Sequence, residues 1–155
     1  MARSSHRRPP YVLYGLLALF LILISSLVVF NAMNPTYRYN DNRFESVFAW
    51  NTFFEEQAPE EDLYLIYSYL ETCGACQQIQ QRVLRFAADE SNVPLFLADA
   101  NNPLLRATAQ DFRPGTSTVV PTLLVIQGNQ LLEEVTGVEG VLNVLEALEN
   151  GTYTP

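Results

Sequence analysis

The chain lacks the side chains on which several classes of enzyme depend. Its 155 residues contain no lysine, so all nine basic residues are arginine, and the single histidine is His6, close to the N-terminus. Catalysis by an active-site lysine, or by a histidine within a folded body, is therefore excluded. The length allows one ordinary domain and excludes a two-domain enzyme.

Positive charge is scarce throughout the chain. Nine arginines stand against 17 acidic residues, which gives a formal net charge of -8 at pH 7. Recognition of nucleic acid needs clustered lysine or arginine to neutralise phosphates, and the arginines of this chain are scattered. The composition therefore argues against a protein that binds nucleic acid.

One long stretch of the chain carries no charge. The twenty residues from Tyr11 to Phe30 are dominated by Leu, Ile, Val, Phe and Ala, and a helix needs about that length to cross a hydrocarbon core. A cleaved secretory signal is one alternative, but its apolar region usually spans about 7 to 15 residues, and Phe30-Asn31-Ala32 does not form a convincing cleavage site. A buried core helix is another, although the run has no amphipathic pattern. We therefore predict an uncleaved transmembrane helix over residues 11–30.

The arginines on either side of this stretch predict its orientation. Arg3, Arg7 and Arg8 precede it, whereas the first arginine after it is Arg38. Because positive residues remain on the cytoplasmic side, residues 1–10 are expected to form a cytoplasmic tail. The rest of the chain would lie outside the cell membrane, attached to it by a single span.

The outer part of the chain divides into a tether and a domain. Residues 31–42 are rich in Asn, Pro, Thr and Tyr without an apolar period, which predicts a linker, and residues 43–155 are predicted to form one domain. The outer part carries six arginines and all 17 acidic residues, a net charge of -11. Such a surface should not adsorb to anionic lipid, so residues 11–30 would provide the membrane contact.

Within the domain, helical and strand-like patterns alternate. The expected elements are a helix over 41–57, a strand over 63–70, a helix over 76–88, a strand over 94–98, a helix over 103–112, strands over 122–126 and 130–135 joined by a tight turn, and a helix over 140–148. This order predicts an α/β fold in which helices cover both faces of a mixed central sheet.

The only two cysteines of the chain fall between a predicted strand and a predicted helix. They form the motif Cys73-Gly74-Ala75-Cys76. Two cysteines three apart at the start of a helix can close a disulfide, and the helix N-terminus stabilises a thiolate on the first of them. Cys73 is therefore the expected nucleophile and Cys76 the resolving thiol, a pair that supports thiol-disulfide exchange without a cofactor.

Two other interpretations of the motif stay open. A structural zinc needs about four cysteine or histidine ligands, and outside His6 the chain offers only Cys73 and Cys76, so no metal site is expected. A purely structural disulfide is the other interpretation, although a ring of four residues constrains the unfolded chain very little.

The motif and its surroundings resemble the thioredoxin-fold family over roughly residues 43–150. The resemblance rests on Cys73 and Cys76 after a strand, on a Val-Pro-Thr sequence that begins a later strand, and on the turns before the last helix. It implies a thioredoxin-like fold in which Pro121 follows a cis bond and packs against the cysteines. The alternative for Pro121 is an ordinary strand-starting proline with a trans bond.

The same resemblance implies how a substrate would bind. The backbone of Val120 is expected to pair with a substrate segment beside the cysteines, as an added strand would, with Thr72 and Thr122 as neighbouring contacts. Gly74 and Ala75 would support the active site from within the motif.

The chain departs from cytoplasmic thioredoxins around the motif. Those proteins usually carry a tryptophan before the first cysteine, a buried acid six positions before it, and a buried lysine nearby. Here Thr72 and Tyr67 occupy the first two positions, and the chain has no lysine. A buried proton acceptor for Cys76 is therefore missing, which argues against efficient general reduction.

Two classes of function agree with these features. The favoured one is a membrane-tethered, extracytoplasmic thiol-disulfide oxidoreductase that acts on exported proteins and exchanges electrons with a redox partner. It resembles small anchored proteins of Gram-positive bacteria, including the bacteriocin transport accessory proteins. The other class is a non-catalytic thioredoxin-like module that uses Val120 to bind an export or membrane partner. A monomer without a cofactor is expected in either class.

Overall fold

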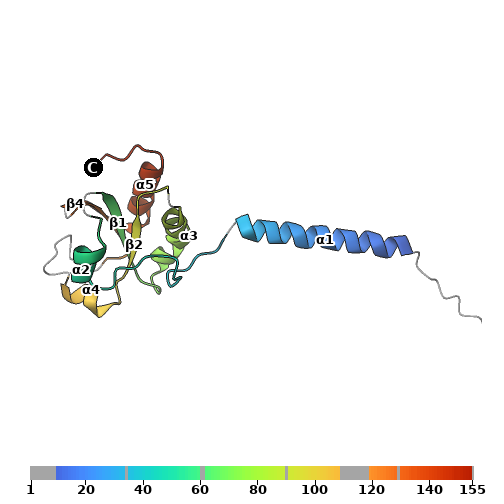
Figure 1. Cartoon of the computed structure of the whole chain (residues 1–155), viewed down its shortest axis with the longest axis horizontal. Coiled ribbons are helices and arrows are strands. Elements are labelled where there is room, and N and C mark those ends of the chain that lie inside the picture. Colours follow the sequence, from blue (N-terminus) through green and yellow to red (C-terminus); the bar gives the residue numbers. More distant parts are fainter. Residues whose placement is uncertain are drawn as a thin grey trace, which may run out of the picture. The chain divides into compact units, whose positions relative to one another are not determined.

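The computed structural model describes residues 10–33, 35–59, 62–89, 91–108, 119–128 and 130–154. The chain divides into two compact units, Met1–Thr36 and Tyr37–Pro155. The first unit contains one long helix, and the second contains the sheet with its flanking helices (Figure 1).

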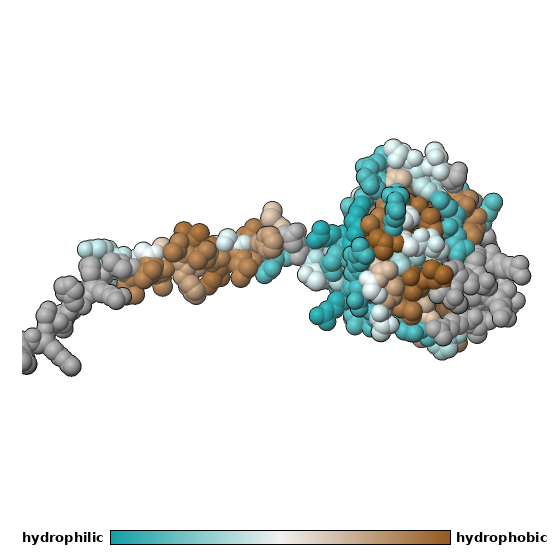
Figure 2. All heavy atoms as spheres, turned by 180° about the vertical axis from the view of Figure 1, so that it is seen from behind, coloured by the Kyte–Doolittle hydropathy of each residue, from teal (hydrophilic) through white to brown (hydrophobic). Residues whose placement is uncertain are grey.

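The first unit is built on helix α1, Pro10–Met33. Its segment Leu13–Met33 has a mean hydropathy of 2.7, and its apolar side chains are exposed (Figure 2). The hydroxyls of Ser25 and Ser26 donate to backbone carbonyls three residues earlier, so both are satisfied within the helix. The helix is long and apolar enough to cross a membrane, a property that an anchor and a signal sequence share. It ends three residues beyond the predicted limit at residue 30.

The second unit is organised around a four-stranded mixed sheet. Its strands are β1, Leu63–Tyr69, β2, Leu95–Asp99, β3, Thr122–Gln127, and β4, Gln130–Thr136. Their order across the sheet is β2-β1-β3-β4, with β1 parallel to β2 and the other pairs antiparallel. The nearly continuous apolar sequence of β1 fits its central place, where both faces of the strand are buried.

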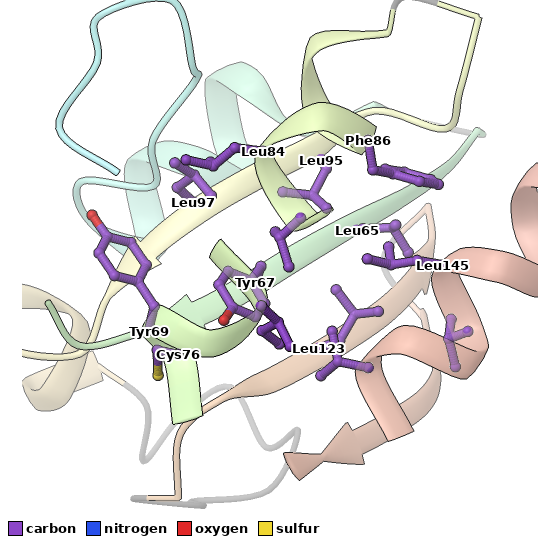
Figure 3. Close-up of a cluster of buried hydrophobic side chains, with 14 of the residues drawn as sticks. Leu65, Tyr67, Tyr69, Cys76, Leu84, Phe86, Leu95, Leu97, Leu123 and Leu145 are labelled. Carbon is purple, nitrogen blue, oxygen red and sulfur yellow. The ribbon is translucent and has the colours of Figure 1, made fainter. Parts of the chain in front are cut away.

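One face of the sheet is covered by α3, Gly74–Ala88, and α5, Gly137–Glu149 (Figure 1). The buried stripes of both helices pack against alternate residues of β1, including Leu65 and Tyr67. Figure 3 shows this hydrophobic layer, with Cys76 among its members. The packing of α3 on the sheet thus fixes the position of the cysteine motif.

The opposite face is covered by α2, Trp50–Thr52, the π-helical turn η1, Phe53–Gln57, and α4, Pro103–Thr108. Tyr64 and Ile66 of β1 point to this side, because successive strand residues face opposite ways. Helices therefore cover both faces of a mixed sheet, as the sequence predicts.

Only the second half of the segment expected as one helix over 41–57 is helical, as α2 and η1. Ser46 forms a parallel bridge with Leu97, and the Val47 N–H donates to the Leu97 carbonyl at 2.8 Å. The predicted helix was wrong here, because this backbone pairs with the outer edge of β2, whose polar groups would otherwise lack partners. Helical structure begins only at Trp50.

The folded unit begins earlier than the sequence suggested. Tyr39 lies in the segment expected to be a linker over 31–42, yet its side chain is 4% exposed and belongs to the core. Tyr37 packs against the same core. The unit therefore starts at Tyr37 rather than at residue 43. The reason is that the two tyrosine rings of this otherwise polar segment pack against core residues that are distant in the sequence.

The remaining predicted elements are present with shifted ends. α3 begins at Gly74 rather than residue 76, and α5 at Gly137 rather than residue 140. α4 is described as far as Thr108, and residues 109–112 of the expected helix lie outside the described residues.

Candidate active site

The two cysteines lie where the central strand β1 leads into α3. After β1 ends at Tyr69, the Cys73 N–H donates to the Leu70 carbonyl at 3.1 Å and closes a turn. Cys73 is the N-cap residue of α3. Gly74 is exposed and Ala75 is half-buried. The turn and the helix together hold the first cysteine at the end of the sheet.

The two thiols have different environments. Both are free, with Cys73 half-buried and Cys76 0% exposed. The Cys76 N–H donates to Cys73 Sγ at 3.2 Å. The first N–H groups of a helix have no partner within the helix, and the Cys73 sulfur accepts a hydrogen bond from one of them. A substrate sulfur can therefore approach Cys73, whereas Cys76 is covered by the protein.

Burial governs the acidity of the inner thiol. Burial first, and then the neighbouring Cys73 sulfur, raise the pKa of Cys76 from 9.0 to about 11. Hydrogen bonds with the Leu70 backbone and the Tyr67 side chain lower this pKa and so oppose the rise. At neutral pH Cys76 is therefore a thiol, which must lose its proton before it can act as a nucleophile.

The loop before β3 faces the outer cysteine. The Cys73 thiol donates to the Val120 carbonyl at 3.7 Å, and the Val120–Pro121 peptide bond is cis, as predicted. Pro121 is buried, and its carbonyl accepts a hydrogen bond from the Gly137 N–H at 2.8 Å. The fold thus brings Val120 to the sulfur of Cys73, although the two residues are 47 positions apart in the sequence.

The three residues predicted to contact a substrate lie in different settings. Thr72 is exposed next to Cys73, and Val120 is half-buried with its carbonyl near the same sulfur. Thr122 is 4% exposed, and its hydroxyl donates to the Val119 carbonyl at 2.7 Å, so its side chain holds the loop together. Substrate contact by these residues stays a prediction.

Sequence analysis missed a tyrosine cluster beside the inner cysteine. The Tyr39 hydroxyl donates to the Cys76 carbonyl at 2.7 Å and lies 3.2 Å from the Tyr67 hydroxyl. The Tyr39 ring stacks on Tyr69, with centroids 4.0 Å apart. Figure 3 shows Tyr67, Tyr69 and Cys76 close together. The available signal was the pair of aromatic residues Tyr37 and Tyr39 in a segment that otherwise looked like a tether.

Metal-binding side chains do not gather in the described ranges of the chain. No group of three or more His, Cys, Asp and Glu residues there is placed to hold a metal ion.

Several thioredoxins of solved structure have a similar fold. Thioredoxin f2 from Chlamydomonas reinhardtii superposes with a TM-score of 0.55 at 15% identity, over 72% of this chain and 99% of its own. A mutant thioredoxin from Halobacterium salinarum gives 0.54 at 21% identity, over 72% and 92% of the two chains. Thioredoxin from Trypanosoma brucei brucei gives 0.54 at 17% identity, over 74% and 96%. The chain has the thioredoxin fold. The sequence matches no protein-family model and no curated protein.

Within this thioredoxin fold, the position at which the resemblance implies a buried acid is occupied by Tyr67, near Cys76. Tyr67 is 0% exposed, belongs to the same buried cluster as Cys76, and acts to lower the pKa of that thiol. The site thus combines a CxxC pair at a helix start with phenol groups on its inner side.

Proposed function

We propose that the protein is a membrane-tethered, extracytoplasmic thiol-disulfide oxidoreductase that acts on disulfides of exported proteins. The observation that carries this proposal is the pairing of a reachable Cys73 with a covered Cys76 three residues on. A half-buried first sulfur and a buried second sulfur provide the two roles that exchange requires.

The two cysteines act in sequence. The Cys73 thiolate attacks one sulfur of a substrate disulfide, which forms a mixed disulfide and releases the other sulfur as a thiolate. Cys76 then loses its proton to solvent and attacks Cys73 Sγ, which closes the protein disulfide and releases the second substrate thiolate. The substrate gains two electrons and the cysteine pair loses two. The reverse sequence oxidises a substrate dithiol.

The Val120 backbone supports a substrate-binding role for this side of the site. Its carbonyl lies 3.7 Å from Cys73 Sγ, so an extended segment paired there would bring its own sulfur beside the nucleophile. Thr72 is exposed on the same side of the motif and would contact that segment.

The N-terminal helix and its flanking charges support this compartment. Residues 11–30 would anchor the chain, the arginine-rich tail would stay in the cytoplasm, and the thioredoxin-fold unit would face exported proteins. A redox partner on the same side of the membrane would restore the cysteine pair after each turnover. The narrower form of this proposal is an accessory role in peptide export, as the resemblance to bacteriocin transport accessory proteins implies.

The reduction potential of the full-length protein in detergent tests the proposal. Equilibration with glutathione buffers, followed by mass spectrometry of the Cys73–Cys76 pair, should show one two-electron transition. We expect a potential above that of thioredoxin, about -270 mV, because the buried acid is replaced by Tyr67 and the compartment favours disulfides that persist. Failure to form the disulfide at any glutathione ratio would overturn the enzyme proposal and favour a non-catalytic binding module.

A further inference from the structure

Tyr39 and Tyr67 place two buried hydroxyls beside the resolving cysteine. Both side chains belong to the buried cluster that contains Cys76, and the two phenol oxygens are 3.2 Å apart. The Tyr39 hydroxyl donates to the Cys76 carbonyl at 2.7 Å. Burial is the largest cause that raises the pKa of each phenol well above its ordinary value, so both keep their protons at the pH at which cysteines react.

The two phenols have only two hydrogens to donate. Tyr39 donates its hydrogen to the Cys76 carbonyl, which leaves the Tyr67 hydrogen for either the Tyr39 oxygen or the Cys76 sulfur. A neutral thiol is a weak acceptor, whereas a thiolate forms a charge-assisted hydrogen bond. The Tyr67 hydroxyl should therefore turn toward the sulfur when Cys76 carries a negative charge.

The segment that follows α1 in the sequence holds Tyr39 in this position. The Tyr37 N–H donates to Gln81 Oε1 at 3.1 Å, and Gln81 Nε2 donates to the Tyr37 carbonyl at 2.7 Å. Gln80 Nε2 donates to the same carbonyl at 3.0 Å. Both glutamines belong to α3, so the helix that carries the cysteines also fixes the backbone next to Tyr39.

The remaining titratable groups around the pair are few in the described part of the chain. Cys73, at the start of α3, raises the pKa of both phenols, and Tyr69 of β1 raises the pKa of Tyr39. Asp99 of β2 and Glu71 of the loop before α3 raise the pKa of Tyr69. Both carboxylates are at least partly exposed, so neither occupies the place of a buried acid.

We propose that Tyr67 is a catalytic hydrogen-bond donor to the Cys76 thiolate, and that Tyr39 is a positioning residue that accepts the Tyr67 hydrogen while Cys76 is neutral. This inference rests on the proposed exchange function. Tyr67 keeps its proton throughout, and in this respect it differs from a carboxylate that accepts the proton of the thiol.

The role of Tyr67 follows from the oxidising direction of the reaction. A substrate thiolate attacks Cys73 Sγ, the Cys73–Cys76 bond breaks, and its electron pair stays on the Cys76 sulfur. The Tyr67 O–H stabilises that leaving group. The second substrate thiol then gives its proton to Cys76, and its sulfur attacks the mixed disulfide. The substrate becomes a disulfide, and the protein is left with a Cys73 thiolate and a Cys76 thiol.

The test uses phenylalanine variants that keep each ring and remove one hydroxyl. Tyr67→Phe and Tyr39→Phe address the pair, and Tyr64→Phe is the matched control. Tyr64 is a buried residue of the same strand whose hydroxyl donates to the Gly128 carbonyl at 3.1 Å, and it belongs to the hydrophobic layer on the other face of the sheet. A structural effect of losing a buried hydroxyl should appear in all three variants.

Ionisation of the inner thiol is the first readout. In full-length protein with Cys73→Ser, carbon-13 NMR of the cysteine Cβ follows Cys76 across pH. We expect Tyr67→Phe to raise the midpoint by about one pH unit, because a hydrogen bond to a charged group is lost. Tyr39→Phe should leave the midpoint at or below the parent value, since the Tyr39 oxygen no longer competes with the Cys76 sulfur for the Tyr67 hydrogen. An unchanged midpoint in Tyr67→Phe, or an equal rise in Tyr64→Phe, would overturn the proposal.

Stopped-flow kinetics with Cys73 restored separate this inference from the proposed function. The probe is an aromatic disulfide that releases a coloured thiolate at each of two steps. Tyr67→Phe should leave the first release, by Cys73, unchanged and slow the second, by Cys76, about three- to fourfold below the midpoint pH, because the roughly tenfold loss of thiolate is partly offset by the greater nucleophilicity of a more basic sulfur. A second release as fast as in wild type would contradict the role of Tyr67. Absence of any release from the wild-type protein would instead remove the proposed function, and the NMR comparison would still decide the tyrosine role.

Discussion

At the scale of single residues, the two cysteines differ in exposure. Cys73 is half-buried and lies 3.7 Å from the Val120 carbonyl, whereas Cys76 is fully covered and has a raised pKa. In the proposed exchange, this difference makes Cys73 the first nucleophile and leaves Cys76 to react once a mixed disulfide has formed.

Serine in place of each cysteine should separate attack from resolution. Cys73→Ser should abolish exchange with a protein disulfide, because the reachable nucleophile is lost. Cys76→Ser should accumulate mixed disulfides in cells, because attack proceeds and resolution does not. Non-reducing gels followed by mass spectrometry measure the trapped species. The double serine variant is the control, and trapping by that variant would contradict the assignment.

Resolution of a mixed disulfide should depend on pH through Cys76. Substrate attached to Cys73 leaves the burial of Cys76 in place, and burial is the largest cause of the raised pKa, so the pKa of Cys76 should stay above 9.0 in the mixed disulfide. Because the thiolate is the nucleophile, the rate should rise about tenfold per pH unit below that pKa and level off above it. Stopped-flow measurement of the second thiolate release gives this profile. A rate already level at pH 7 would show that Cys76 ionises much more readily than its burial implies.

At the scale of elements, the start of α5 supports the loop beside the cysteines. The Gly137 N–H donates to the Pro121 carbonyl at 2.8 Å, and Gly137 has a φ of 82°. This left-handed backbone conformation favours glycine, so one residue both begins the helix and positions a donor for the loop.

Alanine substitutions at two glycines of α5 should have opposite effects on stability. Gly137→Ala should lower the free energy of unfolding by about 1–2 kcal/mol, because its φ is unfavourable for a residue with a Cβ although the space around it is open. Gly140→Ala should raise it by about 0.5–1 kcal/mol, because the helix interior favours alanine and the new methyl meets Val135 at an ordinary 3.5 Å. Denaturant titration of both variants measures the difference. A stabilising Gly137→Ala would contradict the conformational argument.

At the scale of the whole molecule, the apolar helix and the thioredoxin-fold unit are two separate compact parts. The helix α1 leaves its apolar side chains exposed, which in water would be costly over such a length. A lipid environment removes that cost, and this is the physical basis for proposing an anchor.

Topology can be tested through the outer cysteine. If the arginine-rich tail is cytoplasmic, an impermeant thiol reagent applied to reduced intact cells, or to spheroplasts where there is an outer membrane, should label Cys73. Cys73→Ser is the control, since the remaining Cys76 is covered. Labelling that appears only after lysis would place the cysteines in the cytoplasm and remove the compartment part of the proposed function.

Much of the fold was predictable because local patterns matched what the folded chain demands. The apolar run of β1 and the amphipathic stripes of α3 and α5 specify a central strand and two surface helices, and they lie where the patterns indicate. The first half of the segment over 41–57 is not helical although its aromatic spacing fits a helix, because pairing with β2 is a long-range interaction that no local pattern reveals.

The sequence by itself determined the CxxC pair, its position between a strand and a helix, and the lack of lysine and of any histidine beyond His6. Only the tertiary structure decided that Tyr39, in the segment expected to be a linker, packs with Tyr67 beside Cys76. The same holds for Thr122, which is buried and hydrogen-bonds within its own loop. The physical reason is that reactivity at a cysteine follows from residue type and helix position, which are local. Burial and hydrogen-bond partners depend instead on which distant segments pack together.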